Sequence, residues 1–399
     1  MPTTTIQFDH HSARFARDGV AVIDELHAAD SLVYTAAHGG YWVTTRMAIA
    51  KEILSDPITF SSRRNDDGSG GVTIPTSGPT LVPAEVDPPY HTAIRRALGP
   101  LLSKKGIEAV RARVERAVDS TLDDVIERGE FDAARDLAWV VAPLTIIDWL
   151  GLPAASREGF VHAVRDGLAS EVVAKNPEAA FAAFTETITT IQSLIADRQQ
   201  SPADDLTSYL AHHADPRFSD DELLWLIFTL LLGGIENTAA LITNSLLELS
   251  EDPQLKQRLM DDRSLIPAAT EEFLRYYSPG VSLGRNVTRD VEIGGQQLRA
   301  GERVLVLVPA ANRDAEAFPD PHVIDINRAN NPHLSFGHGA HYCAGVWLAR
   351  MEFHYLLNQI FDRIPDFTID RAHGVRYEDA GIMNGWSSLP ATTGRQANA

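Results

Sequence analysis

The segment FGHGAHYCAG, from Phe336 to Gly345, carries the densest chemistry of the chain and decides how the rest is interpreted. Its glycines allow tight backbone turns close to Cys343, the single cysteine, which cannot form an internal disulfide. A helix is expected to begin near Ala344. The partial positive charge and the free N–H groups at a helix N-terminus stabilise a thiolate as a metal ligand. The segment therefore predicts a thiolate site at Cys343.

Three interpretations of this cysteine compete. A buried thiol that packs as a small hydrophobic group is the usual fate of a single cysteine, but it does not explain the glycines. A zinc site would use His338, His341 and Cys343, but the segment offers neither a fourth ligand nor a supporting carboxylate. A haem iron held by one thiolate needs one cysteine on a hydrogen-bonding loop and a large apolar slot, and it explains most of the pattern.

Composition describes an ordinary water-soluble globular chain and limits its partners. The 399 residues are 44% hydrophobic and 22% charged, which excludes collagen-like and wholly disordered chains. There are 35 basic and 54 acidic residues, a net charge of −19, so we expect no nucleic acid partner. No charged residue interrupts Leu223 to Ile235, but this run is shorter than the roughly 20 residues that span a bilayer. The N-terminal residues lack the apolar core of a secretory signal, so a cytoplasmic protein with no membrane association is expected.

The order of patterns along the chain predicts the fold class. Residues 1–399 contain no repeat, long linker or composition break, so we expect one domain. Ser61 to Thr80 is rich in Gly, Ser, Asp and Pro and is expected to be a long loop that covers a site. Helical periodicity dominates, which predicts a mainly α fold with a minor β region. We expect helices around 104–128, 142–150, 178–198, 221–250, 265–277 and 343–362, and strands at 41–45 and within 291–309, with a turn at Gly294-Gly295.

The helix expected at about 220–250 is the best defined of these. Ser219 and Glu222 have the spacing of a capping box, and the apolar face that follows is too continuous for a surface helix. Gly233 and Gly234 each cost roughly 1 kcal/mol relative to alanine inside a helix. The pair suggests that something approaches this backbone closely, and simple contact with another helix is the alternative.

With these features assembled, the sequence resembles the cytochrome P450 family of haem-thiolate monooxygenases over nearly the whole chain. The resemblance implies the cytochrome P450 fold, with haem b between a long central helix and the helix that follows the cysteine loop. It also implies Cys343 as the iron ligand and O2 as co-substrate. The family signature Phe-Gly-x-Gly-x-His/Arg-x-Cys-x-Gly is matched at each fixed position, by Phe336, Gly337, Gly339, His341, Cys343 and Gly345.

Two further sets of residues take their roles from the resemblance. The family motif Glu-x-x-Arg appears as Glu272 and Arg275, which are expected to join Arg328 in a buried ionic network with a structural role. Basic side chains are expected to bind the buried haem carboxylates, because such groups require charge-assisted donors. The residues expected to bind the cofactor are His91, Arg95, Arg285, Phe336, His341 and Gly345.

The helix that activates dioxygen in the family departs from its usual pattern here. The family normally has an acid followed by threonine, whereas this chain has Glu236, Asn237 and Thr238. An amide donates and accepts hydrogen bonds but does not relay a proton as simply as a hydroxyl. Asn237 either replaces threonine functionally, with the substrate's own oxygen assisting, or tunes a less common oxidation, or marks a slow and leaky enzyme. We favour the first and expect all three residues to be catalytic.

Electrons and substrate have to come from outside the chain. It contains no dinucleotide fingerprint, so the resemblance implies a ferredoxin or flavodoxin-like donor with its NAD(P)H reductase. Basic residues that could dock an acidic donor are Arg95, Arg96, Lys104, Lys105, Arg111 and Arg113. The substrate is expected to be small and lipophilic, a terpenoid or an aromatic compound, which the enzyme hydroxylates or dealkylates. Expected pocket residues are Ile74, Leu230, Gly233, Gly234, Val281, Leu283 and Met383. A haem-binding sensor or carrier without turnover is the alternative.

Overall fold

The computed structural model describes residues 5–156, 159–161 and 177–394, and these fall into two compact units. Unit 1 comprises Met1–Arg95, Glu271–Ala344 and Glu378–Asn384, and unit 2 comprises Arg96–Thr270, Gly345–Tyr377 and Gly385–Ala399. The expectation of one domain over residues 1–399 stays a prediction.

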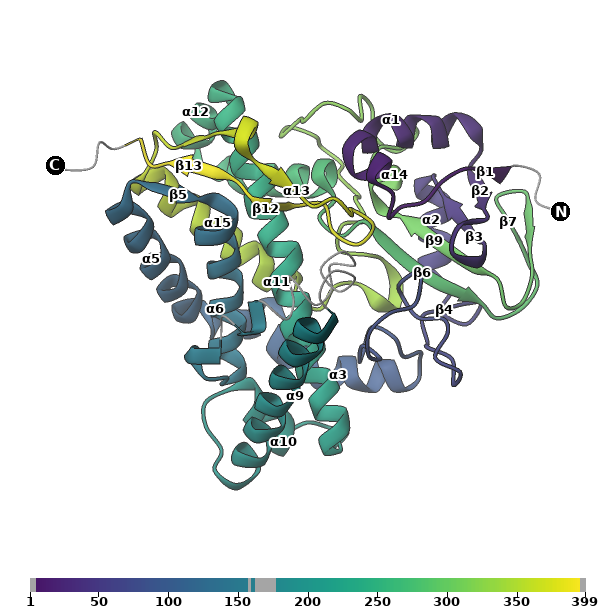
Figure 1. Cartoon of the computed structure of the whole chain (residues 1–399), viewed down its shortest axis with the longest axis horizontal. Helices are drawn as coiled ribbons and strands as arrows, with labels where there is room; N and C mark the ends of the chain where they lie inside the picture. Colours follow the sequence, from purple (N-terminus) through teal and green to yellow (C-terminus); the bar gives the residue numbers. More distant parts are fainter. Residues whose placement is uncertain (1–4, 157–158, 162–176, 395–399) are drawn as a thin grey trace. The chain divides into compact units, whose positions relative to one another are not determined.

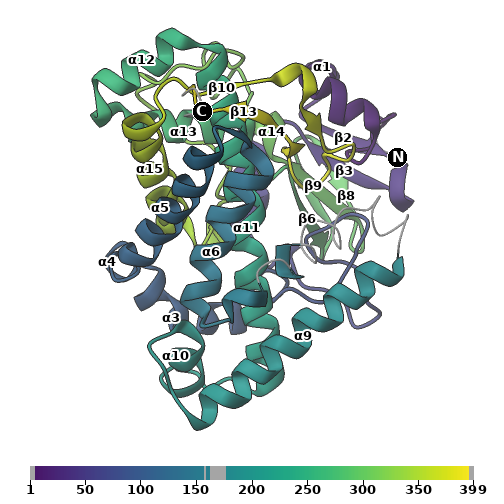
Figure 2. The ribbon, with the colours of Figure 1, turned by 60° about the vertical axis from the view of Figure 1, so that its left-hand side comes forward.

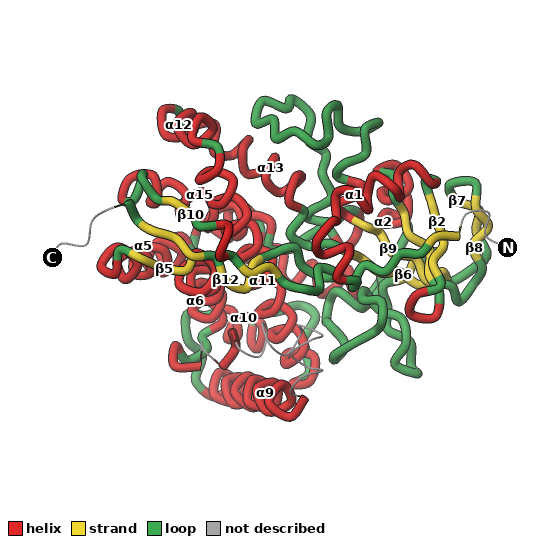
Figure 3. The backbone as a smooth tube through the Cα atoms, turned by 45° about the horizontal axis from the view of Figure 1, so that its top comes forward, coloured by secondary structure: helices red, strands yellow, loops and turns green. Residues whose placement is uncertain are grey.

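Unit 1 is built on a six-stranded mixed sheet, whose strands are drawn in yellow in Figure 3. The order is β1-β2-β3-β9-β6-β4. The central strand β9 pairs in parallel with β3 and antiparallel with β6. A hairpin of β7 and β8 turns at Gly294-Gly295, as predicted. The strands are β1 (Thr5–Ile6), β2 (Leu32–Thr35), β3 (Tyr41–Thr44), β4 (Phe60–Ser61), β6 (Ser282–Val287), β7 (Val291–Ile293), β8 (Gln296–Leu298) and β9 (Arg303–Leu307).

Both faces of this sheet are buried, and β9 shows why. Val304 and Val306 pack into one apolar cluster with Trp42, while the alternate residues Leu305 and Leu307 pack into a second cluster on the other side. A strand covered on both faces is a continuous apolar run, which is the pattern of this segment. The helices of unit 1 are α1 (Ala13–Ala29), α2 (Met47–Ser55) and α14 (Val308–Ala311), while α3 (Tyr90–Leu102) and α13 (Ile266–Tyr277) cross from one unit into the other.

Unit 2 is mainly helical, and α6 lies between α5 and α11 (Figures 1 and 2). Its helices are α4 (Lys104–Glu108), α5 (Arg111–Arg128), α6 (Trp139–Leu150), α9 (Pro177–Gln200), α10 (Leu206–His212), α11 (Asp220–Glu251), α12 (Pro253–Asp261) and α15 (Val346–Arg363). Its short strands are β5 (Glu130–Asp132), β10 (Thr368–Ile369), β11 (Val375–Arg376), β12 (Trp386–Ser388) and β13 (Pro390–Thr392).

The long helix α11 begins with the predicted capping box: Ser219 Oγ accepts from the Glu222 amide, and Glu222 accepts from the Ser219 amide. By length and composition alone α11 could cross a membrane. However, 61% of its most apolar window is buried, which is how the core helix of a folded protein passes the same test.

The mainly α fold with a minor β region is confirmed, with two corrections to element bounds. The helix expected over 104–128 is broken into α4 and α5, because Val110, with φ −99° and ψ 1°, leaves the helical conformation. The helix expected from 343 starts only at Val346, because Cys343 belongs to the preceding loop and Gly345 is the N-terminal cap.

Candidate active site

The cysteine loop of unit 1 is held by its own backbone and by its glycines. The Cys343 amide donates to the Phe336 carbonyl oxygen at 2.8 Å, which closes the loop just before the cysteine. Gly339 has φ +68°, and a Cβ at this position would lie 2.2 Å from the carbonyl oxygen of Leu54 on α2. Only glycine therefore allows this approach. The partly exposed thiol of Cys343 sits at a fixed point of the fold.

Four basic side chains of unit 1, which we call the basic cluster, gather near this loop: His91, Arg95, Arg285 and His341. The rings of His91 and His341 lie 4.0 Å apart, although both are cationic when protonated. Burial, and then Arg285, lower the pKa of His341 to about 3; burial, and then Arg95, lower the pKa of His91 to about 4. Burial also lowers the pKa of Arg285 to about 10 and that of Arg95 below its usual range.

The basic cluster fits a ligand with two carboxylates. Burial without matching anions disfavours the charged forms of all four groups, and Asp87 is the acid that opposes this at His91 and Arg285. In addition, Nδ1 of the buried His91 has no hydrogen-bond partner. A buried polar atom without a partner costs free energy unless a ligand satisfies it. Carboxylates bound next to Cys343 would stabilise the charged forms of the basic groups and would accept a hydrogen bond from His91 Nδ1, as the carboxylates of a haem do.

The alternative zinc set is not assembled. Among residues 5–156, 159–161 and 177–394, no group of three or more His, Cys, Asp or Glu side chains is placed to hold a metal ion. His341 Nε2 instead contacts Ser62 Oγ at 3.1 Å. His338, His341 and Cys343 therefore do not form a common site.

The Glu272 network, a second polar cluster of unit 1, lies around one carboxylate. Arg275 donates to both oxygens of Glu272, at 2.8 and 2.9 Å, and Arg328 approaches the same carboxylate at 3.3 Å. Arg275, fully buried, also donates to the carbonyl oxygens of Asn312, Pro321 and Val323. Asn331 Nδ2 adds a bond to Glu272 at 3.0 Å. The structure thus brings Glu272, Arg275 and Arg328 together.

In unit 2, the middle of α11 presents an exposed face. Gly233 and Asn237 are both exposed and stand four residues apart, so they share one face of the helix. A Cβ added at Gly233 would contact nothing within 4 Å, whereas one at Gly234 would lie 3.2 Å from Ile146 of α6. The glycine pair therefore combines an open backbone at Gly233 with helix contact at Gly234.

The two polar neighbours of Asn237 lie in different surroundings. Glu236 is partly exposed, yet desolvation raises the pKa of its carboxyl group to about 7. Thr238 is 5% exposed and lies on the buried side of α11. Leu230, also predicted for the pocket, is partly exposed. The structure thus brings Glu236 and Asn237, but not Thr238, to the accessible part of the helix.

The expected pocket residues of unit 1 occupy three connected segments. Ile74 and Val281 are buried in the same apolar cluster, 3% and 2% exposed, and Leu283 packs from β6 against the cluster on the other face of the sheet. Met383 pairs with Gly280 in a short antiparallel bridge. Ile74, Val281 and Met383 are therefore close in the fold, while Leu283 points to the other side of the sheet.

Comparison with known proteins shows the family to which the chain belongs. A family model described as Cytochrome P450 matches residues 171–365. Cytochrome P450 107B1 of Saccharopolyspora erythraea is 32% identical over 88% of this chain and 89% of its own length. Nocardicin C N-oxygenase of Nocardia uniformis is 35% identical, with the same coverage. The chain belongs to the cytochrome P450 family.

A solved structure extends the likeness to the fold of this cytochrome P450. The chain is similar to Mycobacterium marinum CYP268A2 in complex with pseudoionone, with a TM-score of 0.87 and 25% identity over 97% of this chain and 99% of that one. Membership confirms that the protein is a monooxygenase of the haem-thiolate type, rather than a haem carrier without turnover. The family uses haem and O2.

Sequence reasoning missed several residues that position the site of this cytochrome P450. Asp87 accepts hydrogen bonds from Ser61 and Ser62, and Ser62 in turn contacts His341. The signal was available in part, since Asp87 lies four residues before His91, whose amide donates to the Asp87 carbonyl oxygen. Ser62 lies 279 residues from His341, and no local pattern could have paired them.

Proposed function

We propose that this cytochrome P450 hydroxylates or dealkylates a small lipophilic substrate, a terpenoid or an aromatic compound, with O2 and two electrons from a separate donor. The observation that carries the proposal is the basic cluster next to the single thiol of unit 1. An external anion would stabilise the charged forms of these four desolvated basic groups and accept a hydrogen bond from the unpartnered Nδ1 of His91, and a thiolate at Cys343 would be a metal ligand.

The residues of unit 1 would hold haem b. Cys343 would supply the thiolate ligand, and the basic cluster would bind the two carboxylates, which in turn favour the protonated forms of His91 and His341. Phe336 and Gly345 bound the cysteine loop in sequence and complete the proposed cofactor site. A thiolate-ligated haem, when bound, supplies the reductive activation of dioxygen. The Glu272 network would brace this unit as a structural element.

Glu236 of unit 2 would deliver protons, and Asn237 would hold and orient a water. A carboxyl group whose pKa is about 7 is both a donor and an acceptor of protons near neutral pH, so Glu236 suits proton delivery. The exposed amide of Asn237 can hold and orient a water or a substrate oxygen by donating and accepting hydrogen bonds. We propose that Asn237 replaces the usual threonine in this way. Thr238 would support the helix and reach the reaction only indirectly.

A lipophilic substrate is supported by the residues expected around it. Ile74, Val281, Met383 and Leu230 are apolar, and the open backbone at Gly233 leaves room for a bulky ligand. The structurally similar CYP268A2 was solved with pseudoionone. These observations support a small, largely apolar molecule.

An acidic electron donor is supported by a basic surface of unit 2. Of the six expected docking residues, Arg96, Lys104, Lys105 and Arg111 are exposed. Lys104 lies over the ring of Trp347, an exposed tryptophan on α15, at 5.5 Å. Three of the six have other interactions: Arg111 and Arg113 pair with acids, and Arg95 belongs to the basic cluster. We propose that a ferredoxin or flavodoxin-like protein, reduced by its NAD(P)H reductase, docks at Arg96, Lys104 and Lys105.

Two measurements test the proposed function: the absorption spectrum of the holoprotein and its oxidation of a substrate. We expect the reduced holoprotein to show a strongly red-shifted Soret band with carbon monoxide, and Cys343→Ser to lose it. A surrogate ferredoxin and reductase should then support oxidation of a terpenoid or aromatic substrate, selected by its spin-state shift. Asn237→Ala should lower the ratio of product formed to electrons consumed. A colourless protein, or a spectrum unchanged by Cys343→Ser, would contradict the proposal.

A further inference from the structure

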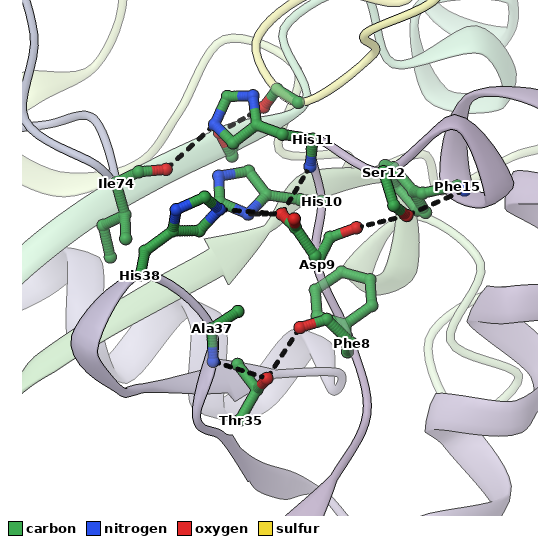
Figure 4. A network of polar contacts seen from close by, with 12 residues as sticks. Phe8, Asp9, His10, His11, Ser12, Phe15, Thr35, Ala37, His38 and Ile74 are labelled. Atoms are coloured by element: carbon green, nitrogen blue, oxygen red, sulfur yellow. Dashed lines mark hydrogen bonds and ion pairs between the residues drawn. The ribbon is translucent and has the colours of Figure 1, made fainter.

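A histidine cluster of unit 1 lies outside the residues assigned above. His10, His11 and His38 gather with Asp9 where the N-terminal segment meets two loops (Figure 4), and Asp379 contacts the His11 ring. The rings of His10 and His11 are 4.1 Å apart, and those of His11 and His38 are 5.6 Å apart. Three histidines at such distances are not accounted for by apolar packing.

His11 is the member that connects different parts of the chain. Its Nε2 lies 2.9 Å from the carbonyl oxygen of Ile74, and its Nδ1 lies 2.9 Å from the carboxylate of Asp379. A carbonyl oxygen and a carboxylate can only accept hydrogen bonds. Both ring nitrogens must therefore carry a proton, so the contacts require a positively charged imidazolium.

The surrounding groups favour a positive charge on the His11 ring and a neutral His10 ring. Burial opposes the charged ring, but the bonds to Asp379 and Ile74 outweigh it and raise the pKa of His11. Burial and the charge of His11 lower the pKa of His10 to about 3, and its Nδ1 lies 2.9 Å from the hydroxyl of Tyr41. His10 is therefore neutral and contacts both the His11 ring and Tyr41 of β3.

The remaining charged and titratable groups support the same arrangement. His38 Nε2 contacts Asp9 at 2.9 Å, and the same carboxylate accepts the backbone amide of His11. Burial opposes the charge of Asp9, but these bonds lower its pKa, so it stays ionised. Burial raises the pKa of Tyr41, which therefore stays protonated. The groups facing His11 are thus Asp9, His10, His38 and Asp379, and Tyr41 lies against His10 and His38.

The loop that carries Asp379 is fitted to the His11 ring. A Cβ added at Gly381 would lie 2.5 Å from His11 Nδ1, so the backbone passes directly against the imidazole. The Gly381 amide donates to Asp379 at 2.8 Å, and the Gly381 carbonyl accepts from Ser282 Oγ at 2.6 Å. The Val281 amide donates to the carbonyl oxygen of Ile382. The loop is thereby fixed in front of the ring.

We propose that His11 is a positioning residue whose imidazolium ring ties the loop carrying Ile74 to the loop carrying Met383, and so controls how easily these two segments separate. The tie itself rests only on unit 1; its consequence for substrate entry rests on the proposed function, in which Ile74 and Met383 contact substrate. The folded-state pKa of His11 is raised, so the tie is present at low pH and is lost as pH rises through that value.

Hydrogen exchange of the holoenzyme tests the tie directly. After correction for intrinsic rates, we expect amides of segments 72–76 and 379–384 to exchange about tenfold faster above the pKa of His11 than below it, as for the loss of one charge-assisted hydrogen bond. His11→Gln, which cannot carry the charge, should show the faster exchange at each pH. The control His38→Gln keeps both contacts of His11 and should retain the dependence on pH.

Gly381→Ala provides a second variant that changes no titratable group. The added methyl group displaces the ring, so exchange of both segments should rise as in His11→Gln while the fold is retained. Exchange that does not depend on pH in the unmodified enzyme, or an equal effect of His38→Gln and His11→Gln, would overturn the proposal.

Binding of 4-phenylimidazole, followed by absorption, separates this proposal from the proposed function. We expect its association and dissociation rates to increase about tenfold in His11→Gln at low pH, where the unmodified enzyme keeps its tie. Unchanged rates would overturn the role in entry. An unmodified protein without any spectral response would instead contradict haem binding, and the exchange result would still decide on the tie.

Discussion

Two buried clusters of unit 1 use similar side chains in opposite ways. In the Glu272 network, Arg275 meets a carboxylate and three carbonyl oxygens, so its positive charge is neutralised within the protein. In the basic cluster, Arg285 donates to the carbonyl oxygen of Gly284, and its pKa is lowered to about 10 by burial. A buried cation that the protein pairs with its own acid is a structural element. A group of basic side chains whose charged forms are all disfavoured by burial is suited to bind an external anion.

The largest effect on the free energy of unfolding should come from removing Arg275 from the Glu272 network. Arg275→Ala leaves the carboxylate of Glu272 buried without its main partner, and we expect it to lower the free energy of unfolding by about 3–5 kcal/mol. Urea unfolding followed by circular dichroism measures this loss. A loss below about 1 kcal/mol would show that the Glu272 network does not stabilise the fold.

Replacing an arginine of the basic cluster by alanine should weaken ligand binding instead. Arg285→Ala removes a desolvated cation, so the haem-free protein should be at least as stable as the unmodified one. Haem affinity should fall by about tenfold to a hundredfold, because one charge-assisted partner of a carboxylate is lost. Transfer of haem to a scavenger protein and urea unfolding measure the two effects. Loss of fold stability comparable to that of Arg275→Ala would remove the distinction between the clusters.

These two clusters also show what the sequence can and cannot predict. Glu272 and Arg275 are three residues apart on one helix, and the cysteine signature is continuous, so the family motifs that these short segments match were enough to select them. The partners Ser62 and Asn331 are brought in by tertiary packing from distant segments, and no local pattern marks them.

The prediction of helices likewise succeeded where a local pattern was strong and failed where tertiary packing stabilises the helix. The strongly apolar α11 and its cap were predicted nearly to the residue, whereas α1 was not predicted at all. The sequence of α1 contains Gly19, and Asp18, with φ −117° and ψ 27°, departs from helical geometry. Its stability comes from burying Phe15, Val22 and Leu26 against the rest of unit 1, which periodicity alone did not resolve.

Acid should lower the stability of the haem-free protein through the two histidines of the basic cluster. His91 and His341 have folded-state pKa values of about 4 and about 3, below the ordinary value near 6.5. The unfolded chain therefore binds protons that the fold excludes, and stability is lost as pH falls below about 6.5. Between pH 7 and pH 5 we expect the haem-free protein to lose about 1–2 kcal/mol of unfolding free energy from this pair.

Urea unfolding at the two pH values measures this acid effect, with His91→Asn/His341→Asn as the control. The double variant should lose less stability on acidification, because it no longer carries the two titrating rings. Bound haem should also reduce the loss, since its carboxylates favour the protonated rings. Equal pH dependence in the haem-free double variant and the unmodified haem-free protein would show that the cluster does not exclude protons.

The smallest effect on the free energy of unfolding should come from Arg328→Lys, which changes the shape of the side chain but keeps its positive charge. Arg328 reaches Glu272 only at 3.3 Å but also donates to the Pro319 carbonyl oxygen at 2.8 Å and lies over the Phe318 ring at 5.8 Å. Lysine keeps the charge but cannot make these planar contacts together, so Arg328→Lys should cost about 1 kcal/mol of unfolding free energy. Haem affinity should stay unchanged, because the network holds no ligand. A fall in haem affinity without a fall in stability would mean that the Glu272 network serves the ligand as well, and the contrast between the two clusters would fail.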